Sequence, residues 1–302
     1  MRLAAIDIGS NAARLLISEV TTKKNEEPEF TKLNLVRVPL RLGFDVFEKG
    51  KIGRRKIEVM VQTMKAFSHL MKAYGVKKVL ACATSAMREA ENQHTVIKEI
   101  REKTGIRIQV ISGDQEAMYI YENHVAEHLE KDHAYLYVDV GGGSTELTFF
   151  NEGKLVYKKS FDIGTIRLLK NKVSEQQWKE LKIHLKTFTQ SKLSKIAIGS
   201  GGSINKIFTL SKRKEDRPLS ISLLKEYYNQ MSTLTVDERM RDYKIRDDRA
   251  DVIVPALKIY IRVMQWAGID EIFVPKVGLA DGLIQHQFYT ALAKQRKRKK
   301  QK

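Results

Sequence analysis

The chain has 302 residues, of which 42% are apolar and 30% are charged. This length and composition exclude a largely disordered chain and indicate about two folded domains with sizeable cores. No apolar run approaches the roughly 18 residues that span a membrane, and the first strand-like run meets Asp7 too early for a signal peptide. We therefore expect a soluble, unexported protein without a membrane partner.

The formal net charge is +18, and seven basic residues lie in the last nine positions, 294–302. A basic balance attracts polyanions in general, so it does not separate nucleic acid, membrane surface and polyphosphate. We interpret the terminal run as a solvated helix end, with contact to a polyanion, nucleic acid included, as the alternative. The single cysteine, Cys82, lies in an apolar run, which predicts a buried thiol in a reducing cytoplasm.

The first part of the chain alternates strands with helices. Two short strands are predicted over 3–8 and 13–20, joined by a tight turn, and a third over 32–40 precedes a glycine-containing loop at 41–53. Apolar residues at three-to-four spacing then predict a helix over 54–74. The elements that follow are strand 78–83, helix 94–103, strand 107–111 and helix 114–130. This alternation is typical of an α/β domain.

The pattern restarts near residue 132, where strands over 134–140 and 145–150 flank a Gly-rich turn and repeat the opening hairpin. Asp7 and Asp139 occupy equivalent places 132 residues apart, about one domain length. We therefore predict two related domains, 1–128 and 129–302. The remaining elements are strand 154–162, helix 174–189, strand 195–198, helices from 204 and over 220–231, 235–240 and 250–266, strand 271–275 and a last helix from about 280.

Each hairpin carries an aspartate before a glycine-rich bend. Glycines let successive N–H groups surround phosphate oxygens, while a carboxylate can hold a divalent cation beside them. Asp139 and Glu146 flank the second bend and supply the hard oxygen ligands of a magnesium-type site, with solvated strand-end acids as the alternative. A further turn at 199–203 could place amides beside a phosphate or nucleoside, or could only connect a strand to a helix.

Two other loops after buried strands carry charged candidates. Arg88 could grip phosphate bidentately, and a surface ion pair with Glu89 or Glu91 is the alternative. Glu116 lies in the first turn of a helix, where it could serve the helix N-terminus or act as a base. The pattern alone favours the capping role and leaves Asp114 as a competing candidate for catalysis.

In their order, these segments resemble the exopolyphosphatase and guanosine pentaphosphate phosphohydrolase (Ppx/GppA) family over nearly all of the chain. The matching motifs are 5–11 (AIDIGSN) with Arg14, 41–43 (RLG), 83–90 (ATSAMREA), 111–117 (ISGDQEA), 138–147 (VDVGGGSTEL), 164–168 (GTIRL), 199–202 (GSGG) and 249–253 (RADVI). The resemblance implies an α/β fold of the actin-like ATPase, Hsp70 and sugar kinase superfamily, with two ribonuclease-H-like domains around a central cleft.

By this resemblance, Glu116 deprotonates the attacking water, and Arg88, Asp139 and Glu146 complete the catalytic set. Asp139, Glu146 and Asp7 would hold Mg²⁺ or another hard divalent cation. The implied substrate-binding residues are Asp7, Gly9, Ser10, Asn11 and Arg14 in the first loop and Gly141, Gly142, Gly143, Ser144 and Thr145 in the second. The reaction would be magnesium-assisted attack of water on a terminal phosphoryl group.

The implied activity is that of a cytoplasmic exopolyphosphatase acting on inorganic polyphosphate. The alternatives are a guanosine pentaphosphate 5′-phosphohydrolase and a polyphosphate-binding or alarmone-binding sensor with weak turnover. The sensor is motivated by Ala12 and Ala280, which replace residues that are often polar in relatives. The chain resembles the short two-domain form of the family, and a homodimer is expected from relatives only.

Overall fold

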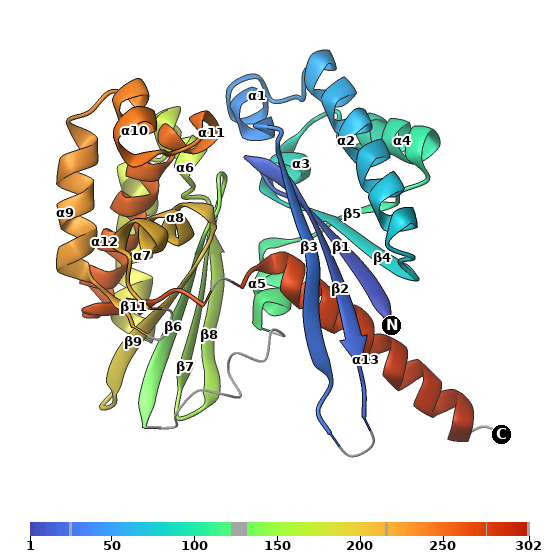
Figure 1. Ribbon diagram of the computed structural model, residues 1–302. Coiled ribbons are helices and arrows are strands. Elements are labelled where there is room, and N and C mark those ends of the chain that lie inside the picture. Colours follow the sequence, from blue (N-terminus) through green and yellow to red (C-terminus); the bar gives the residue numbers. More distant parts are fainter. Residues whose placement is uncertain (24–25, 122–131, 215–216, 276, 301–302) are drawn as a thin grey trace. The chain divides into compact units, whose positions relative to one another are not determined.

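The computed structural model describes residues 1–23, 26–121, 132–214, 217–275 and 277–300 (Figure 1). Its contacts divide the chain into two compact units. Unit 1 comprises Met1–Asn123 and Leu279–Lys302, and unit 2 comprises His124–Gly278. Among the helices of these described ranges, none combines the length and apolar character that crossing a membrane requires.

Unit 1 contains a five-stranded sheet in the order β3-β2-β1-β4-β5. Strands β1 (Arg2–Ile8), β2 (Ala12–Thr21) and β3 (Glu29–Pro39) are successively antiparallel. Strands β4 (Lys78–Ala83) and β5 (Ile108–Val110) follow on the other side of β1 and run parallel to it. This is the strand order of a ribonuclease-H-like domain, with the almost fully buried β1 at its centre.

Unit 1 has two helices that the sequence reading missed, α1 (Leu42–Lys49) and α3 (Ser85–Glu89). The segment of α1 was predicted to be a loop, because the glycine at its end was read as part of that loop. Gly50 instead ends the helix in the left-handed conformation (φ 72°) and donates its N–H to the carbonyl of Val46. The helices of the unit are α1 (Leu42–Lys49), α2 (Arg54–Ala73), α3 (Ser85–Glu89), α4 (Gln93–Thr104), α5 (Gly113–Tyr121) and α13 (Leu279–Lys300).

The last helix departs from the predicted domain ranges. The second domain was expected to run from 129 to 302, but α13 packs along β1 in unit 1 (Figure 1). Leu283, Ile284 and Phe288 of this helix are buried in one cluster with Leu3 and Ala5 of β1. The apolar stripe of α13 therefore covers one face of the first sheet, so the chain returns to unit 1. The predicted boundary at 128–129 lies outside the described residues, as does the predicted end of the helix at 130.

Unit 2 repeats the same topology, which confirms the duplication inferred from the two hairpins. Its sheet has the order β10-β11-β9-β6-β7-β8, and β6, β7 and β8 are again successively antiparallel while β9 and β11 follow in parallel. A short antiparallel strand, β10, extends the far edge. The strands are β6 (His133–Val140), β7 (Thr145–Asn151), β8 (Lys154–Phe161), β9 (Ser194–Ser200), β10 (Leu219–Ser220) and β11 (Glu271–Phe273).

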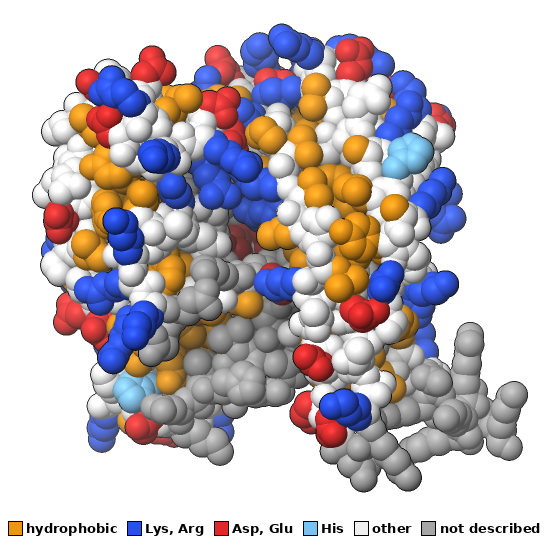
Figure 2. Space-filling model, in the orientation of Figure 1, with side chains coloured by type: hydrophobic (Ala, Val, Ile, Leu, Met, Phe, Trp, Pro, Cys, Tyr) orange, Lys and Arg blue, Asp and Glu red, His pale blue; other side chains and the backbone are white. Residues whose placement is uncertain are grey.

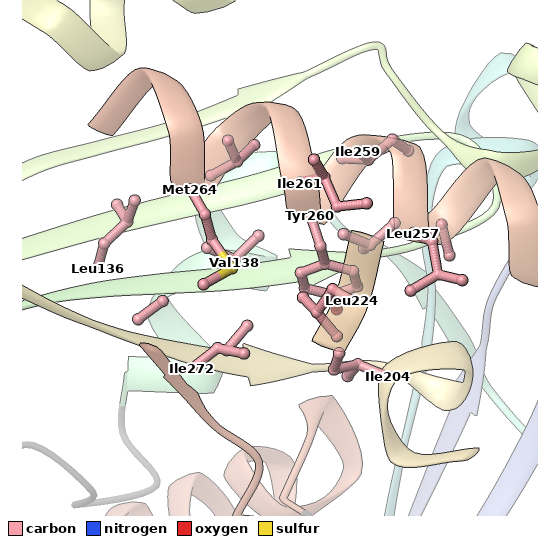
Figure 3. Packing of buried hydrophobic residues seen from close by; sticks show 14 of the residues in the cluster. Leu136, Val138, Ile204, Leu224, Leu257, Ile259, Tyr260, Ile261, Met264 and Ile272 are labelled. Carbon is pink, nitrogen blue, oxygen red and sulfur yellow. The ribbon is translucent and has the colours of Figure 1, made fainter. Parts of the chain in front are cut away.

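The core of unit 2 centres on helix α12 (Ile253–Ala267), which has nine buried residues. Tyr260 and Met264 of this helix lie over Val138 and Leu136 of β6 (Figure 3). The helix predicted over 250–266 is divided in the structure, because α11 (Asp247–Ala250) is a separate short turn. The other helices are α6 (Thr165–Leu169), α7 (Glu175–Phe188), α8 (Gly202–Ser211), α9 (Ile221–Ser232) and α10 (Val236–Tyr243).

The packing of α13 on unit 1 can be tested by truncating one aromatic side chain. Phe288 is buried and its ring lies edge-on to Phe30 at 5.6 Å between centroids. Phe288→Ala should lower the free energy of unfolding by about 3 kcal/mol, because it removes a large buried ring from the core. Urea unfolding followed by circular dichroism measures the change, with the exposed Thr290→Ala on the same helix as control. Equal midpoints for the two variants would contradict the assignment of α13 to the core of unit 1.

Candidate functional site

The turn between β1 and β2 is held by its own backbone and by the loop after β4. The N–H of Gly9 donates to the carbonyl of Ala12 at 3.0 Å. The buried hydroxyl of Ser10 lies 2.8 Å from the hydroxyl of Ser85 and accepts the N–H of Ala86 at 3.2 Å. The side chain of Ser10 therefore ties the first turn to the start of α3.

Asp7 lies at the end of β1, directly opposite Arg14 of β2. The carboxylate of Asp7 is 3% exposed, and its Oδ2 accepts a hydrogen bond from Nη1 of Arg14 at 2.8 Å. Burying a lone carboxylate is costly, so the guanidinium offsets the cost with an opposite charge. Two predicted substrate-binding residues are thus joined in one ion pair.

The carboxyl ends of β1, β4 and β5 bring predicted residues to one edge of the first sheet. Cys82 of β4 is paired in register with Asp7. Burial, followed by the charges of Asp7 and Glu116, raises the pKa of the Cys82 thiol to about 12. Both carboxylates therefore lie near the same buried thiol, although they are 109 positions apart in the chain. The prediction that Cys82 is a buried, non-disulfide cysteine is confirmed.

Ser112 and Gln115 cap the start of α5, the helix that carries Glu116. The N–H of Gln115 donates to the Ser112 hydroxyl at 3.1 Å, and the N–H of Ser112 donates to the Gln115 side chain at 3.0 Å. Glu116 lies in the first turn of the helix and is 8% exposed, whereas Asp114 is exposed. The capping interpretation of Glu116 stays a prediction, and burial distinguishes Glu116 from Asp114.

Arg88 is half-buried and follows β4 in α3. Its Nη1 donates to the carbonyl of Ile111 at 2.8 Å, at the start of the loop that leads to Glu116. This bond holds the guanidinium beside the loop that carries Glu116. The surface ion pair with Glu89 or Glu91 stays an alternative prediction. Unit 1 thus gathers Arg88, Asp7 and Glu116 at the carboxyl ends of neighbouring parallel strands, where ligands of α/β sheets bind.

The glycine loop of unit 2 is oriented by the helix that follows β8. The carbonyls of residues 141–143 accept hydrogen bonds of 2.6–3.3 Å from the first amides of α6 and from Nε of Arg167. Because a trans peptide directs its N–H opposite to its C=O, the next amides, those of 142–144, point away from α6. Three successive N–H groups facing one way form an arrangement that suits an anion.

The polar groups of unit 2 form one row across four neighbouring strands. In register, Ser200 of β9 pairs with Asp139 of β6, Asp139 pairs with Glu146 of β7, and Glu146 pairs with Ser160 of β8. Glu146 is 3% exposed, and its Oε1 accepts the hydroxyl of Ser160 at 2.8 Å. The predicted pair Asp139 and Glu146 is thus brought side by side, between two hydroxyl groups that the sequence reading did not single out.

Tyr260 is another residue near this pair that the sequence reading missed. Its buried hydroxyl donates to the carbonyl of Ser200, and burial, followed by the charges of Asp139 and Glu146, raises its pKa well above the ordinary value. The phenol therefore stays protonated near both carboxylates. The signal in the sequence was a tyrosine within an otherwise apolar helix, which a core position explains equally well.

The turn at 199–203 approaches the carboxylate pair closely. Gly201 has φ 120°, and a Cβ there would lie 2.9 Å from the carbonyl of Val140 and 3.4 Å from Oδ1 of Asp139. Gly202 lies against the guanidinium of Arg249, whose Nη2 would be 3.3 Å from an added Cβ. Both glycines permit a close approach that larger residues would block, so this turn packs against the site rather than only connecting two elements.

The orientation of the glycine loop depends on Gly164, which precedes α6. A Cβ at this position would lie 2.4 Å from the carbonyl oxygen of Gly142. Gly164→Ala should destabilise unit 2 by about 3 kcal/mol, because the loop backbone must move to admit the methyl group. Tryptophan fluorescence during urea unfolding reports on this unit, which contains Trp178 and Trp266. Gly278→Ala, where an added Cβ meets nothing within 4 Å, is the control, and equal stability of the two variants would contradict the close contact.

The comparisons with known proteins agree with this arrangement. The model of the Ppx/GppA phosphatase family matches residues 19–290. The chain is 30% identical over 300 residues to a bifunctional 3-dehydroquinate synthase/phosphatase of Fusobacterium nucleatum, covering 90% of this chain and 44% of that protein. It therefore spans less than half of this relative.

Two further similarities cover nearly the whole of both chains. Exopolyphosphatase 1 of Mycobacterium leprae is 24% identical over 304 residues, which cover 94% of this chain and 88% of that protein. The crystal structure of an exopolyphosphatase from Cytophaga hutchinsonii superposes with a TM-score of 0.81 at 25% identity, covering 97% and 98% of the two chains. The expected fold class is thereby confirmed.

Proposed function

The chain belongs to the Ppx/GppA phosphatase family, and we propose from this membership that it is an exopolyphosphatase, which hydrolyses the terminal phosphate of inorganic polyphosphate. The observation that carries the proposal is the buried Glu116 near Asp7, with Arg88 reaching the same loop. The names of the relatives from M. leprae and C. hutchinsonii support the substrate class. Lys and Arg side chains are spread over the drawn face of both units, in keeping with an anionic substrate (Figure 2).

In unit 1, the proposed chemistry assigns a proton-transfer role to Glu116. The carboxylate of Glu116 is buried, so a water molecule held beside it would be the group from which it takes a proton. Glu116 would accept a proton from the attacking water while Arg88 holds an oxygen of the terminal phosphate. The ion pair of Asp7 with Arg14 fixes the first loop beside these groups.

In unit 2, the amides of 142–144 would hold phosphate oxygens whose negative charge grows during the reaction. Asp139 and Glu146 lie directly opposite each other, an arrangement of like charges that is unfavourable unless a cation neutralises it. The described residues contain no group of three or more His, Cys, Asp or Glu side chains arranged to hold a metal. The two carboxylates of Asp139 and Glu146 fit Mg²⁺, which keeps water and phosphate oxygens as further ligands, better than they fit zinc. When bound, Mg²⁺ would neutralise charge on the phosphoryl oxygens.

The alternative within the family is a guanosine pentaphosphate 5′-phosphohydrolase, in which the 199–203 turn, packed against Asp139, would lie beside the nucleoside. A sensor with weak turnover is less well supported, because the chain has the residues that turnover would need, Glu116, Arg88, Asp139 and Glu146.

A cytoplasmic location and nucleic-acid contact through residues 294–302 are proposals from the sequence, and a homodimer is a proposal from the relatives.

The role of Glu116 can be tested with its neighbour as a matched control. Glu116→Gln keeps the shape of the side chain but removes its basicity, so turnover of polyphosphate should fall by at least about 100-fold. Binding of polyphosphate, measured by isothermal titration, should be retained. Asp114→Asn alters an exposed carboxylate of the same helical turn and should leave turnover within about 2-fold of the wild type. Normal turnover of Glu116→Gln would refute the assignment of the base.

The substrate class can be decided by one phosphate-release assay with Mg²⁺. Short and long polyphosphate, guanosine pentaphosphate and ATP are compared at matched phosphate concentration. We expect the fastest phosphate release from polyphosphate. Release should be lost when a chelator removes Mg²⁺, because the ion would neutralise charge on the phosphoryl oxygens. Release from guanosine pentaphosphate alone would establish the alternative, and tight binding without release from any substrate would establish the sensor.

A further inference from the structure

The row of polar residues in unit 2 extends beyond the two carboxylates. Ser160 stands at its outer end, on β8, which is the edge strand of the six-stranded sheet. Its backbone pairs with Glu146, so the two side chains share one face of the sheet. The bond from the Ser160 hydroxyl to Oε1 of Glu146 is 2.8 Å long. It spans neighbouring strands and is therefore set by register, not by local sequence.

The position of Ser160 is not explained by packing alone. Lys158, two residues before Ser160 on the same face of β8, is only half-buried. Val156, farther along the same strand, is 52% exposed. Sheet pairing uses backbone groups and needs no hydroxyl at this site. Glu146, by contrast, is 3% exposed and needs donors that replace lost water. The hydroxyl is thus placed where it serves the carboxylate.

We propose that Ser160 is a positioning residue that orients Glu146 for a divalent cation. A carboxylate has two oxygens with several acceptor sites, so a bond at Oε1 fixes its orientation and leaves acceptor capacity for a cation. The inference rests on the proposed function only for the choice of Mg²⁺ as the ion.

The test measures metal binding in the absence of any substrate. Mn²⁺ serves as a paramagnetic probe, its free concentration is followed by electron paramagnetic resonance, and Mg²⁺ is added as competitor. Ser160→Ala should weaken binding of both ions by about 10-fold, the lower end of the effect of removing a group that orients a metal ligand. Ser160→Thr retains the hydroxyl on a residue that strands favour and should restore most of the affinity.

The control variant removes a similar bond elsewhere in unit 2. The hydroxyl of Ser191 donates to Oδ1 of Asn151 at 2.7 Å, on a residue that is likewise partly buried and outside the polar row. Ser191→Ala should leave metal affinity unchanged. Thermal unfolding of all variants without metal shows whether each is folded, and Ser160→Thr supplies the comparison if the alanine variant is unstable.

The outcomes separate this inference from the proposed function. Equal metal affinity of Ser160→Ala and wild type, or equal loss in Ser160→Ala and Ser191→Ala, would overturn the positioning role. A loss of metal affinity in Ser160→Ala that Ser160→Thr restores would establish the positioning role, even if no phosphate were released from polyphosphate. In that case the proposed function alone would fail, because the binding measurement involves no turnover.

Discussion

Carboxylates withdrawn from water near the ends of two equivalent hairpin strands set the conditions for the rest of each unit. Asp7 is the penultimate residue of β1 and is buried, Asp139 is the penultimate residue of β6 and is half-buried, and each lies opposite one of the first residues of the next strand. Water cannot solvate such groups fully, so the protein must supply charges or donors. In unit 1 this partner is Arg14, whereas in unit 2 Asp139 meets the carboxylate of Glu146 and the polar groups around it.

This difference gives related hairpins different chemistry. The first carries a carboxylate whose charge is matched by an arginine. The second concentrates negative charge, which is unfavourable for folding and favourable for a cation. Duplication therefore supplied two copies of one backbone, and the residue opposite each aspartate decided what that copy can bind.

Close backbone contacts hold the loops around these carboxylates. Gly164 lies against the backbone of the 141–144 loop, and Gly201 lies against Val140 and Asp139. The contacts with α6 turn the loop carbonyls to one side and the next amides to the other. The orientation of the loop amides thus depends on a helix more than 20 residues later in the chain.

The sequence by itself determined the duplicated hairpins, the strand and helix alternation and the placement of Asp7, Arg88, Asp139 and Glu146 at strand ends. These features follow from local periodicity and turn chemistry, which act between near neighbours. Only the tertiary structure decided that α13 belongs to unit 1, that Glu116 is buried while Asp114 is exposed, and that Ser160 and Tyr260 lie near the carboxylate pair. Burial and cross-strand contact depend on segments that are distant in the chain, so a local sequence pattern does not predict them.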